Sequence, residues 1–349
     1  MATRRVGFQR KVLRVERLEN RELMAGDVLA RVEGQMLVIW GDDADNGVTL
    51  TYSSATQSYR VSGRDAGGSA TTINGLDTSQ PGNVVEFSGV KQVYVGLNGG
   101  NDDFEVGSAA AVDTVIEKWL SIEMGAGDDV VKLGAAGNAP SGGAPIAQAL
   151  DVGTSLNVNL GVGNDQLSIG NAEIGLGLNV LAGDGDDNVT FDTEFTPAGA
   201  SEPTIFSVRV NGSVFINLAG GADALLMENA SLQRSLNVLD GSGAADIDLS
   251  NVSVAKRFDL HTGSEADDID LVKVRAKQLA MNTNSGIDDV SLESCRFTTL
   301  NIKLGAARDN LRIARTRSSL VTNLNGEAQG AKYANINNSL RNVWRRHLG

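Results

Sequence analysis

The chain has 349 residues, of which 41 are glycine and only 5 are proline, and its formal net charge is −13. Glycine does not recur at every third position, which excludes a collagen-like helix, and the single cysteine, Cys295, excludes intramolecular disulfides. The negative charge argues against a nucleic-acid partner. No apolar run approaches the ~18–20 residues of a membrane-spanning helix, so we expect no transmembrane segment.

The charge is unevenly distributed along the chain. Residues 1–26 contain seven basic and three acidic side chains, and residues 305–349 contain eight basic and two acidic ones. The stretch between them, 27–304, holds 15 basic and 38 acidic residues. We expect a targeting segment at the basic N-terminus and a solubilising role at the basic C-terminus. Contact with acidic glycans or membrane surfaces is the alternative.

The first predicted segment, residues 1–27, is a candidate export or sorting signal. Its second half resembles the LEPR-XLL-type signature of large exported bacterial repeat proteins, although Asn20 and Met24 depart from that pattern. The matching residues are Leu18, Glu19, Arg21, Leu23 and Ala25-Gly26. The resemblance implies handling at the cell envelope or export, and therefore an extracellular or cell-surface location. An ordinary amphipathic helix is the alternative for this segment.

The next segment, residues 28–92, does not follow the repeat of the later chain. Strand-like alternation of apolar and polar residues occurs at 35–40, 48–52 and 58–61, separated by polar turns. We expect an N-terminal β-meander that caps the first coil of the repeat.

Residues 93–337 contain ten copies of an apolar triplet with period-two spacing. The triplets are Val93-Val95-Leu97, Leu120-Ile122-Met124, Leu156-Val158-Leu160, Leu178-Val180-Ala182, Val214-Ile216-Leu218, Leu236-Val238-Asp240, Phe258-Leu260-Thr262, Leu279-Met281-Thr283, Leu300-Ile302-Leu304 and Leu320-Thr322-Leu324. Their third members, taken as anchors, are 20 to 36 residues apart and most often 21 or 22. Apolar residues recur near +7, +9 and +14 from the anchor.

This pattern predicts three short strands and three turns in each coil of about 22 residues. The fold class that it favours is all-β, a right-handed parallel β-helix of about ten coils in which each coil contacts only its neighbours. A leucine-rich repeat is the rival, but the return segments here are too short and too rich in β-branched residues. The 36-residue spacings place insertions at 134–152 and 192–206, on the same side of the stack. Residues 338–349 are expected to form a C-terminal cap, with Val343 or Trp344 over the apolar stack.

Two polar columns accompany the repeat. An aspartate stands five residues after the anchor in eight of the ten copies, and Asn171, Asn229 and Asn251 all stand at +11. Asparagines at equivalent places on successive coils favour a hydrogen-bonded ladder. Aspartates ~5 Å apart repel each other, so their column suggests a bound cation, although aspartate also favours turns for local hydrogen bonding.

The turns between the first two strands resemble the calcium-binding RTX repeats, whose nonapeptide is G-G-x-G-x-D-x-U-x. The turns at 125–129, 161–165 and 183–187 fit best. Calcium takes six to eight oxygen ligands, and glycine turns can direct backbone carbonyls toward an ion. The candidate metal-site residues are Gly125, Gly127, Asp128, Asp129, Gly161, Gly163, Asn164, Asp165, Gly183, Gly185, Asp186 and Asp187. The predicted cofactor is therefore Ca²⁺.

The sequence favours a non-enzymatic protein, because His261 and His347 are too few and too far apart for a catalytic triad or a zinc site. We expect an extracellular structural or adhesive module, stabilised by calcium in its first coils. Its partners would be cell-surface or matrix components, glycans or copies of itself. A polysaccharide-binding or polysaccharide-cleaving β-helix and a metal-free scaffold are the alternatives.

Overall fold

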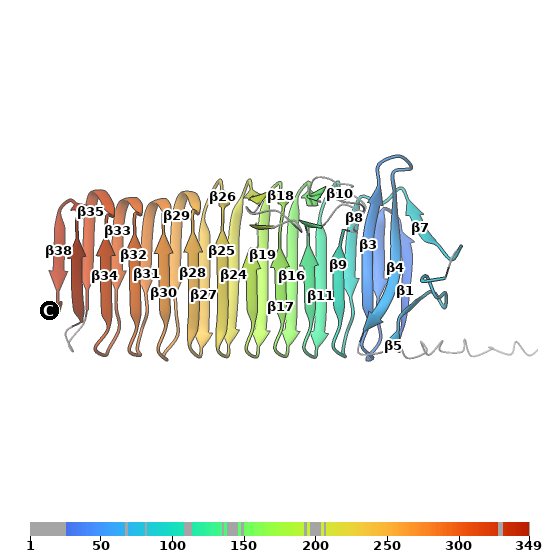
Figure 1. Cartoon of the computed structure of the whole chain (residues 1–349), viewed down its shortest axis with the longest axis horizontal. Coiled ribbons are helices and arrows are strands. Elements are labelled where there is room, and N and C mark those ends of the chain that lie inside the picture. Colours follow the sequence, from blue (N-terminus) through green and yellow to red (C-terminus); the bar gives the residue numbers. More distant parts are fainter. Residues whose placement is uncertain are drawn as a thin grey trace, which may run out of the picture.

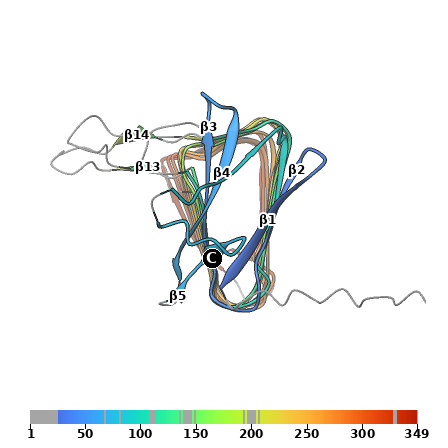
Figure 2. The same ribbon diagram turned by 90° about the vertical axis from the view of Figure 1, so that its right-hand side faces the viewer.

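The chain folds into a long stack of β-coils, shown from the side in Figure 1. The structure is a computed structural model that describes residues 26–348 except 67–68, 81, 108–113, 135, 138–145, 148–149, 192–193, 196–203, 206 and 327–330. Within this part of the chain every regular element is a β-strand. Most of the proposed export segment, 1–25, lies outside it. Viewed along the stack in Figure 2, the coils superpose and outline two long walls.

The first wall is a column of parallel strands with one long strand from each coil. It consists of β2 (Met36–Trp40), β8 (Gln92–Gly96), β11 (Leu120–Ala126), β16 (Ser155–Val162), β19 (Gly177–Asp184), β24 (Ser213–Gly220), β27 (Leu236–Ser242), β29 (Ser253–His261), β31 (Arg275–Asn282), β33 (Arg296–Lys303), β35 (Arg317–Asn325) and β38 (Val343–Arg346).

The opposite wall is a second parallel column, which follows the Gly-Asp turns. It consists of β3 (Gly47–Ser53), β9 (Asp103–Val106), β12 (Val130–Leu133), β17 (Gln166–Ile169), β20 (Asn188–Phe191), β25 (Asp223–Glu228), β28 (Ala245–Ser250), β30 (Asp268–Val272), β32 (Asp289–Glu293), β34 (Asn310–Ala314) and β36 (Lys332–Ile336).

A short third strand closes the early coils, and it merges with the long strand from β29 onward. The short strands are β10 (Thr114–Ile116), β15 (Leu150–Val152), β18 (Ala172–Ile174), β23 (Val208–Val210) and β26 (Ala230–Leu232). The expected triplets align in register from Val93 to Leu300. The parallel β-helix predicted from the 22-residue period is therefore confirmed.

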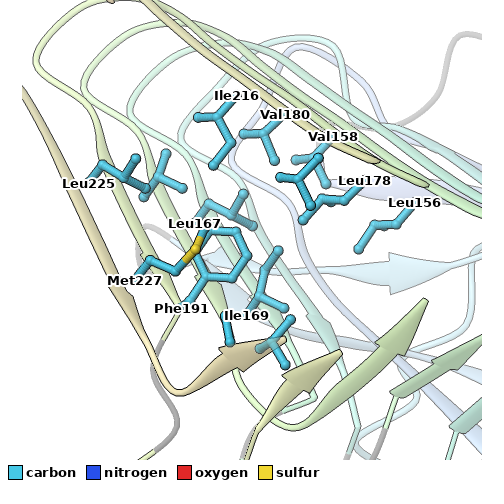
Figure 3. Close-up of a cluster of buried hydrophobic side chains, with 14 of the residues drawn as sticks. Leu156, Val158, Leu167, Ile169, Leu178, Val180, Phe191, Ile216, Leu225 and Met227 are labelled. Carbon is cyan, nitrogen blue, oxygen red and sulfur yellow. The ribbon is translucent and has the colours of Figure 1, made fainter. Parts of the chain in front are cut away.

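The core lies between the walls and follows from strict alternation along each strand. Because successive side chains on a strand point to opposite faces, every second residue enters the core. Figure 3 shows Leu156, Leu178 and Val180 of one wall facing Leu167 and Phe191 of the other. Each of these side chains is at most 2% exposed. Cys295 also lies in this core.

The N-terminal segment is a meander, but it also contributes the first coil. β1 (Asp27–Glu33) pairs antiparallel with β2, and β4 (Ser58–Ala66) pairs antiparallel with β3. β2 and β3 in turn pair in parallel with β8 and β9, so the parallel stack begins before residue 93. The edge of this region is completed by β5 (Ser69–Ala70), β6 (Thr72–Ile73) and β7 (Val85–Ser88).

The last coils differ from the sequence alignment. Leu300 pairs with Thr322 rather than Leu320, and an irregularity between Phe297 and Thr299 places one extra residue in β35. Leu320 is 54% exposed. The alignment of the tenth triplet was wrong by two positions. Residues of the expected C-terminal cap form β37 (Ser339–Leu340) and β38, which extend the sheet. Trp344 points to solvent and is 71% exposed.

Each predicted insertion contains a short antiparallel pair. β13 (Ala136–Gly137) pairs with β14 (Ile146–Ala147), and β21 (Glu194–Phe195) pairs with β22 (Thr204–Ile205). β13 and β14 lie to one side of the stack in Figure 2.

The glycine turns stack so closely that they exclude any side chain. Gly163 has φ +142°, and a Cβ on it would lie 1.9 Å from the carbonyl oxygen of Gly127 in the coil below. Gly185 stands in the same relation to Gly163, again at 1.9 Å. Glycine is thus required twice, for its positive φ and for the close approach of backbones.

We expect Gly163→Ala to lower the free energy of unfolding well beyond the ~1–3 kcal/mol that a strained backbone conformation costs by itself. The reason is that the new methyl group displaces the backbone of the neighbouring coil. Urea denaturation measures the difference. The matched control is Gly75→Ala, since Gly75 also has positive φ but no atom within 4 Å of a built Cβ. Equal losses in the two variants would contradict the steric argument.

Candidate functional site

The aspartates at +5 form a column inside the turns, between the two walls. Asp129 follows the Gly-Asp turn of its coil, and Asp165 and Asp187 occupy the same place in the next two coils. The column consists of Asp102, Asp129, Asp165, Asp187, Asp223, Asp267, Asp288 and Asp309, each no more than 2% exposed. The predicted column is therefore real, and its side chains face the interior of the protein.

Each of these carboxylates fastens its own coil to the preceding one. The backbone N–H of Asp129 donates to Oδ1 of Asp165 at 2.8 Å, and the N–H of Asp165 donates to Oδ1 of Asp187 at 2.9 Å. The pattern starts at Asn46, whose N–H donates to Oδ1 of Asp102 at 2.7 Å. Buried backbone N–H groups need a partner, and here the side chain of the next coil supplies it. We call this array the inner ladder.

The inner ladder is interrupted once and repaired locally. Ala245 stands where an aspartate is expected, and the N–H of Asp223 donates instead to the carbonyl of Ala244 at 3.1 Å. In the same coil the anchor position, apolar in the preceding coils, is Asp240, which is 7% exposed. Its Oδ2 accepts the N–H of Gly263 at 3.2 Å. This coil therefore has its buried carboxylate before the turn, at position 240, whereas the other coils of the ladder have it after the turn.

The second oxygen of each early ladder carboxylate is left without a hydrogen bond. Among the residues that the structure describes, Oδ2 has no partner in Asp102, Asp129, Asp165, Asp187 and Asp223. A buried charge without a partner is costly, so these groups favour their neutral form.

Burial dominates the pKa of these groups. It raises the pKa of Asp102 to about 8 and that of Asp129 and Asp187 to about 7, with neighbouring ladder carboxylates adding to the effect. The pKa of Asp223, Asp240 and Asp288 rises to about 6 for the same main reason. Burial also raises the pKa of Asp165 and Asp267. The protein therefore contains a row of stacked, buried carboxyl groups whose pKa values are raised toward neutral pH.

A second array runs along the solvent side of the same turns in the opposite direction. The N–H of Asn164 donates to Oδ1 of Asp128 at 2.8 Å, and the N–H of Asp186 donates to Oδ1 of Asn164 at 2.8 Å. Here the side chain of one coil accepts from the next coil, whereas in the inner ladder it accepts from the preceding coil. We call this array the outer ladder. The turns from Asp45 to Ala222 are thus held from both sides.

The structure divides the predicted calcium residues among three places. Asp129, Asp165 and Asp187 face the core, whereas Asp128, Asn164 and Asp186 face solvent, and the six glycines form the stacked turn between them. One oxygen of every one of these side chains already serves a backbone N–H. Within the described ranges, no group of three or more His, Cys, Asp or Glu side chains is arranged to hold a metal ion.

The sequence contained a signal for the inward orientation. Asp at +5 has the same parity as the apolar residues at +7 and +9, and residues two apart on a strand share a face. One rung of the expected asparagine ladder is present, and it lies near the surface rather than in the core. Asn229 and Asn251 adopt positive φ at a corner of the coil, and Asn251 donates from Nδ2 to Oδ1 of Asn229 at 2.7 Å. Both lie near the surface.

No protein-family model, curated protein or solved structure matches this chain. The part of the chain that the structure describes contains no helix of the length and apolarity needed to cross a membrane.

We expect the folded protein to lose stability as the pH rises from about 5 to about 9, because the ladder pKa values exceed the ordinary value of 3.8. A carboxyl group whose pKa is higher in the folded than in the unfolded state contributes its full stabilisation at pH values below the unfolded pKa. That contribution is lost as the pH passes through the folded pKa, here about 6 to 8. The thermal unfolding midpoint across this pH range measures the effect.

Asp129→Asn keeps an acceptor for the N–H of Asp102 but cannot ionise, so its midpoint should fall less over the same range. Asp246→Asn, an exposed acid outside both ladders, is the control and should keep the wild-type pH dependence. A midpoint that is flat with pH in the wild type would show that the buried carboxylates are compensated in another way.

Proposed function

We propose that this chain is an extracellular structural or adhesive module, a stiff spacer rather than an enzyme. The observation that carries the proposal is the parallel pairing of strands from coil to coil on both walls. The inner ladder reinforces it at one turn, and the outer ladder does so from Asp45 to Ala222. Such a stack resists bending and local opening because each coil is held by backbone hydrogen bonds to both neighbours. We propose no catalytic role for His261 or His347, which are both exposed.

Cell-surface location rests on the N-terminal resemblance to exported bacterial repeat proteins. The partners we propose are cell-surface or matrix components. An acidic module disfavours nucleic acid as a partner, since the two repel each other.

If the N-terminal segment directs export, substitutions of its matching residues should retain the protein inside the cell. We expect Leu18→Ala, Arg21→Ala and Leu23→Ala together to abolish labelling of the full chain by a membrane-impermeant reagent on intact source cells. Val12→Ala, outside the matching residues, is the control and should be labelled normally. Labelling of both variants, or absence of the wild type from the surface, would overturn the proposed location.

Calcium is a second proposal, which rests on the RTX resemblance and on the outer ladder. Asp128 and Asp186 stand two coils apart with Asn164 between them, and each offers solvent a carboxylate. A cation bound beside this array would offset the repulsion between the two carboxylates. The inner carboxylates are poorer candidates, because their remaining oxygens face an apolar core.

We expect millimolar calcium to raise the thermal midpoint relative to chelator, since a ligand bound at 100 times its Kd adds about 2.7 kcal/mol. Asp128→Asn with Asp186→Asn should remove the rise. The control pair Asp246→Asn with Asp268→Asn, exposed acids outside the three turns at 125–187, should retain it. An identical midpoint in calcium and in chelator would leave the metal-free scaffold.

A further inference from the structure

A row of exposed cations runs along the later coils, and we call it the basic ridge. Arg275, Arg296 and Arg317 begin β31, β33 and β35 and are direct register partners, so they stand one strand spacing apart, ~4.8 Å. Lys277 lies beside the first of them. All four side chains are exposed, and none forms an ion pair with an acid of the described ranges.

The ridge borders a shallow groove along the stack. From β29 onward the short third strand and the long strand form one continuous strand, and the register is irregular near this junction. The groove lies there, and its apolar lining includes the buried side chains of Val254, Ala276 and Phe297. Thr298 and Ser319 line the same groove and are exposed. The groove therefore combines a row of cations with an apolar floor and accessible hydroxyl groups.

The stacked arginines repel each other in the isolated chain, because like charges directly opposite on adjacent strands are destabilising. Protection of a sheet edge does not account for the row, since β31 and β33 each pair with a strand on both sides. A ligand that brings one negative charge to each rung would remove the repulsion. The arrangement therefore favours an anionic partner with regularly spaced charges.

The net charge of −13 does not extend to this end of the chain. Residues 273–349 hold 13 basic and 5 acidic side chains, whereas residues 27–272 hold 10 basic and 35 acidic ones. Two of the five acids, Asp288 and Asp309, are buried in the inner ladder. The local balance at the ridge is therefore positive, and it is the local balance that an approaching ion meets at physiological salt, where charges are screened within about 8 Å.

The acids that precede the ridge do not cancel it. Glu293, three residues before Arg296, is already paired with Arg312 and Arg315. The exposed aspartates of β30 and β32 belong to the second wall, and a corner with positive φ at Lys273 separates that wall from the ridge. The two sets of side chains therefore face different directions, and the groove is open to an anion.

We propose that the basic ridge and its groove bind a linear polyuronate, an acidic polysaccharide with one carboxylate on every sugar. A guanidinium group can hold a carboxylate through two parallel N–H···O bonds, and charge-assisted bonds are stronger than neutral ones. A polymer with one anion per sugar suits an array with one cation per coil. Thr298 and Ser319 add partners for sugar hydroxyl groups. The inference rests on the proposed cell-surface role and names its partner.

A polyuronate fits the groove better than a nucleic acid does. Proteins that bind single strands stack the bases on aromatic side chains. The aromatic residue that lines this groove, Phe297, is 2% exposed and offers no ring face to a base. Recognition of a polyuronate by its carboxylates needs no such ring.

The test is the binding of polygalacturonate to the full chain, measured by isothermal titration calorimetry in chelator. The chelator prevents calcium from joining carboxylates of the polymer to those of the protein. Binding should weaken as ionic strength rises from about 0.05 M to about 0.5 M, because exposed ion pairs are screened by salt. Fully methyl-esterified polygalacturonate has the same backbone without the charge and should not bind.

The ridge variant Arg275→Gln, Arg296→Gln, Arg317→Gln should bind polygalacturonate about tenfold more weakly or worse, because three ion pairs are lost. Its thermal midpoint should equal or exceed that of the wild type, since the substitutions remove repulsion between neighbouring strands. An intact midpoint separates loss of the ligand site from loss of the fold.

The control Arg308→Gln, Lys332→Gln, Arg341→Gln removes the same charge from exposed positions of the same basic stretch and should bind as the wild type does. Equal weakening in both variants would show that overall charge is responsible and would refute the site. So would a wild type that fails to bind at low ionic strength.

Tighter binding of an oligothymidylate or of dextran sulfate than of polygalacturonate, lost in the ridge variant, would overturn the proposal in favour of a nucleic acid or a sulfated glycan. None of these results bears on the proposed location, which is tested separately by surface labelling. A protein that is labelled on the cell surface but does not bind polygalacturonate would refute the ligand alone.

Discussion

The structure depends on one repeated interaction, the hydrogen bond from a backbone N–H to the aspartate Oδ1 of the next coil. A glycine turn brings the backbones of successive coils so close that no side chain fits between them. That approach leaves turn N–H groups inside the protein, where water cannot satisfy them. A short acceptor on the next coil is required, and aspartate at the inner position supplies it. The parallel registers of both walls are compatible with this geometry.

Most of the fold was predictable from the sequence because its cause is local and periodic. The triplets from Val93 to Leu300 align in the structure as the 22-residue period predicts, since alternation alone decides which residues enter the core. The tenth triplet was misaligned because an irregularity in β35 changes the register, and no composition signal marks it. Leu320 is exposed as a result. The rule that looks for aspartate at +5 also could not reveal that one coil has alanine there, at 245, and carries its buried aspartate at 240 instead.

The candidate site was predicted in its residues but not in its orientation. The Gly-Asp motif suggested ligands for an ion, whereas Asp129 and Asp165 point into the core and bond to the backbone. Motif resemblance fixes the residue types in a turn. It does not determine which face of the strand those residues occupy. That face follows from their spacing to the next apolar residues, because residues an even number of positions apart on a strand share a face.

The direction of the inner ladder has a consequence for how the chain acquires its structure. Every inner acceptor belongs to the coil that follows its donor, as Asp165 follows Asp129 and Asp187 follows Asp165. When the chain emerges from the ribosome or a translocon with its N-terminus first, the inner hydrogen bond of each turn can therefore form only after the next coil has emerged. The newest coil always carries an exposed turn N–H that the next 20 or so residues will cover. Elongation of such a stack is a vectorial process, in which the growing end recruits the following segment and the starting end, covered by the β-meander, does not.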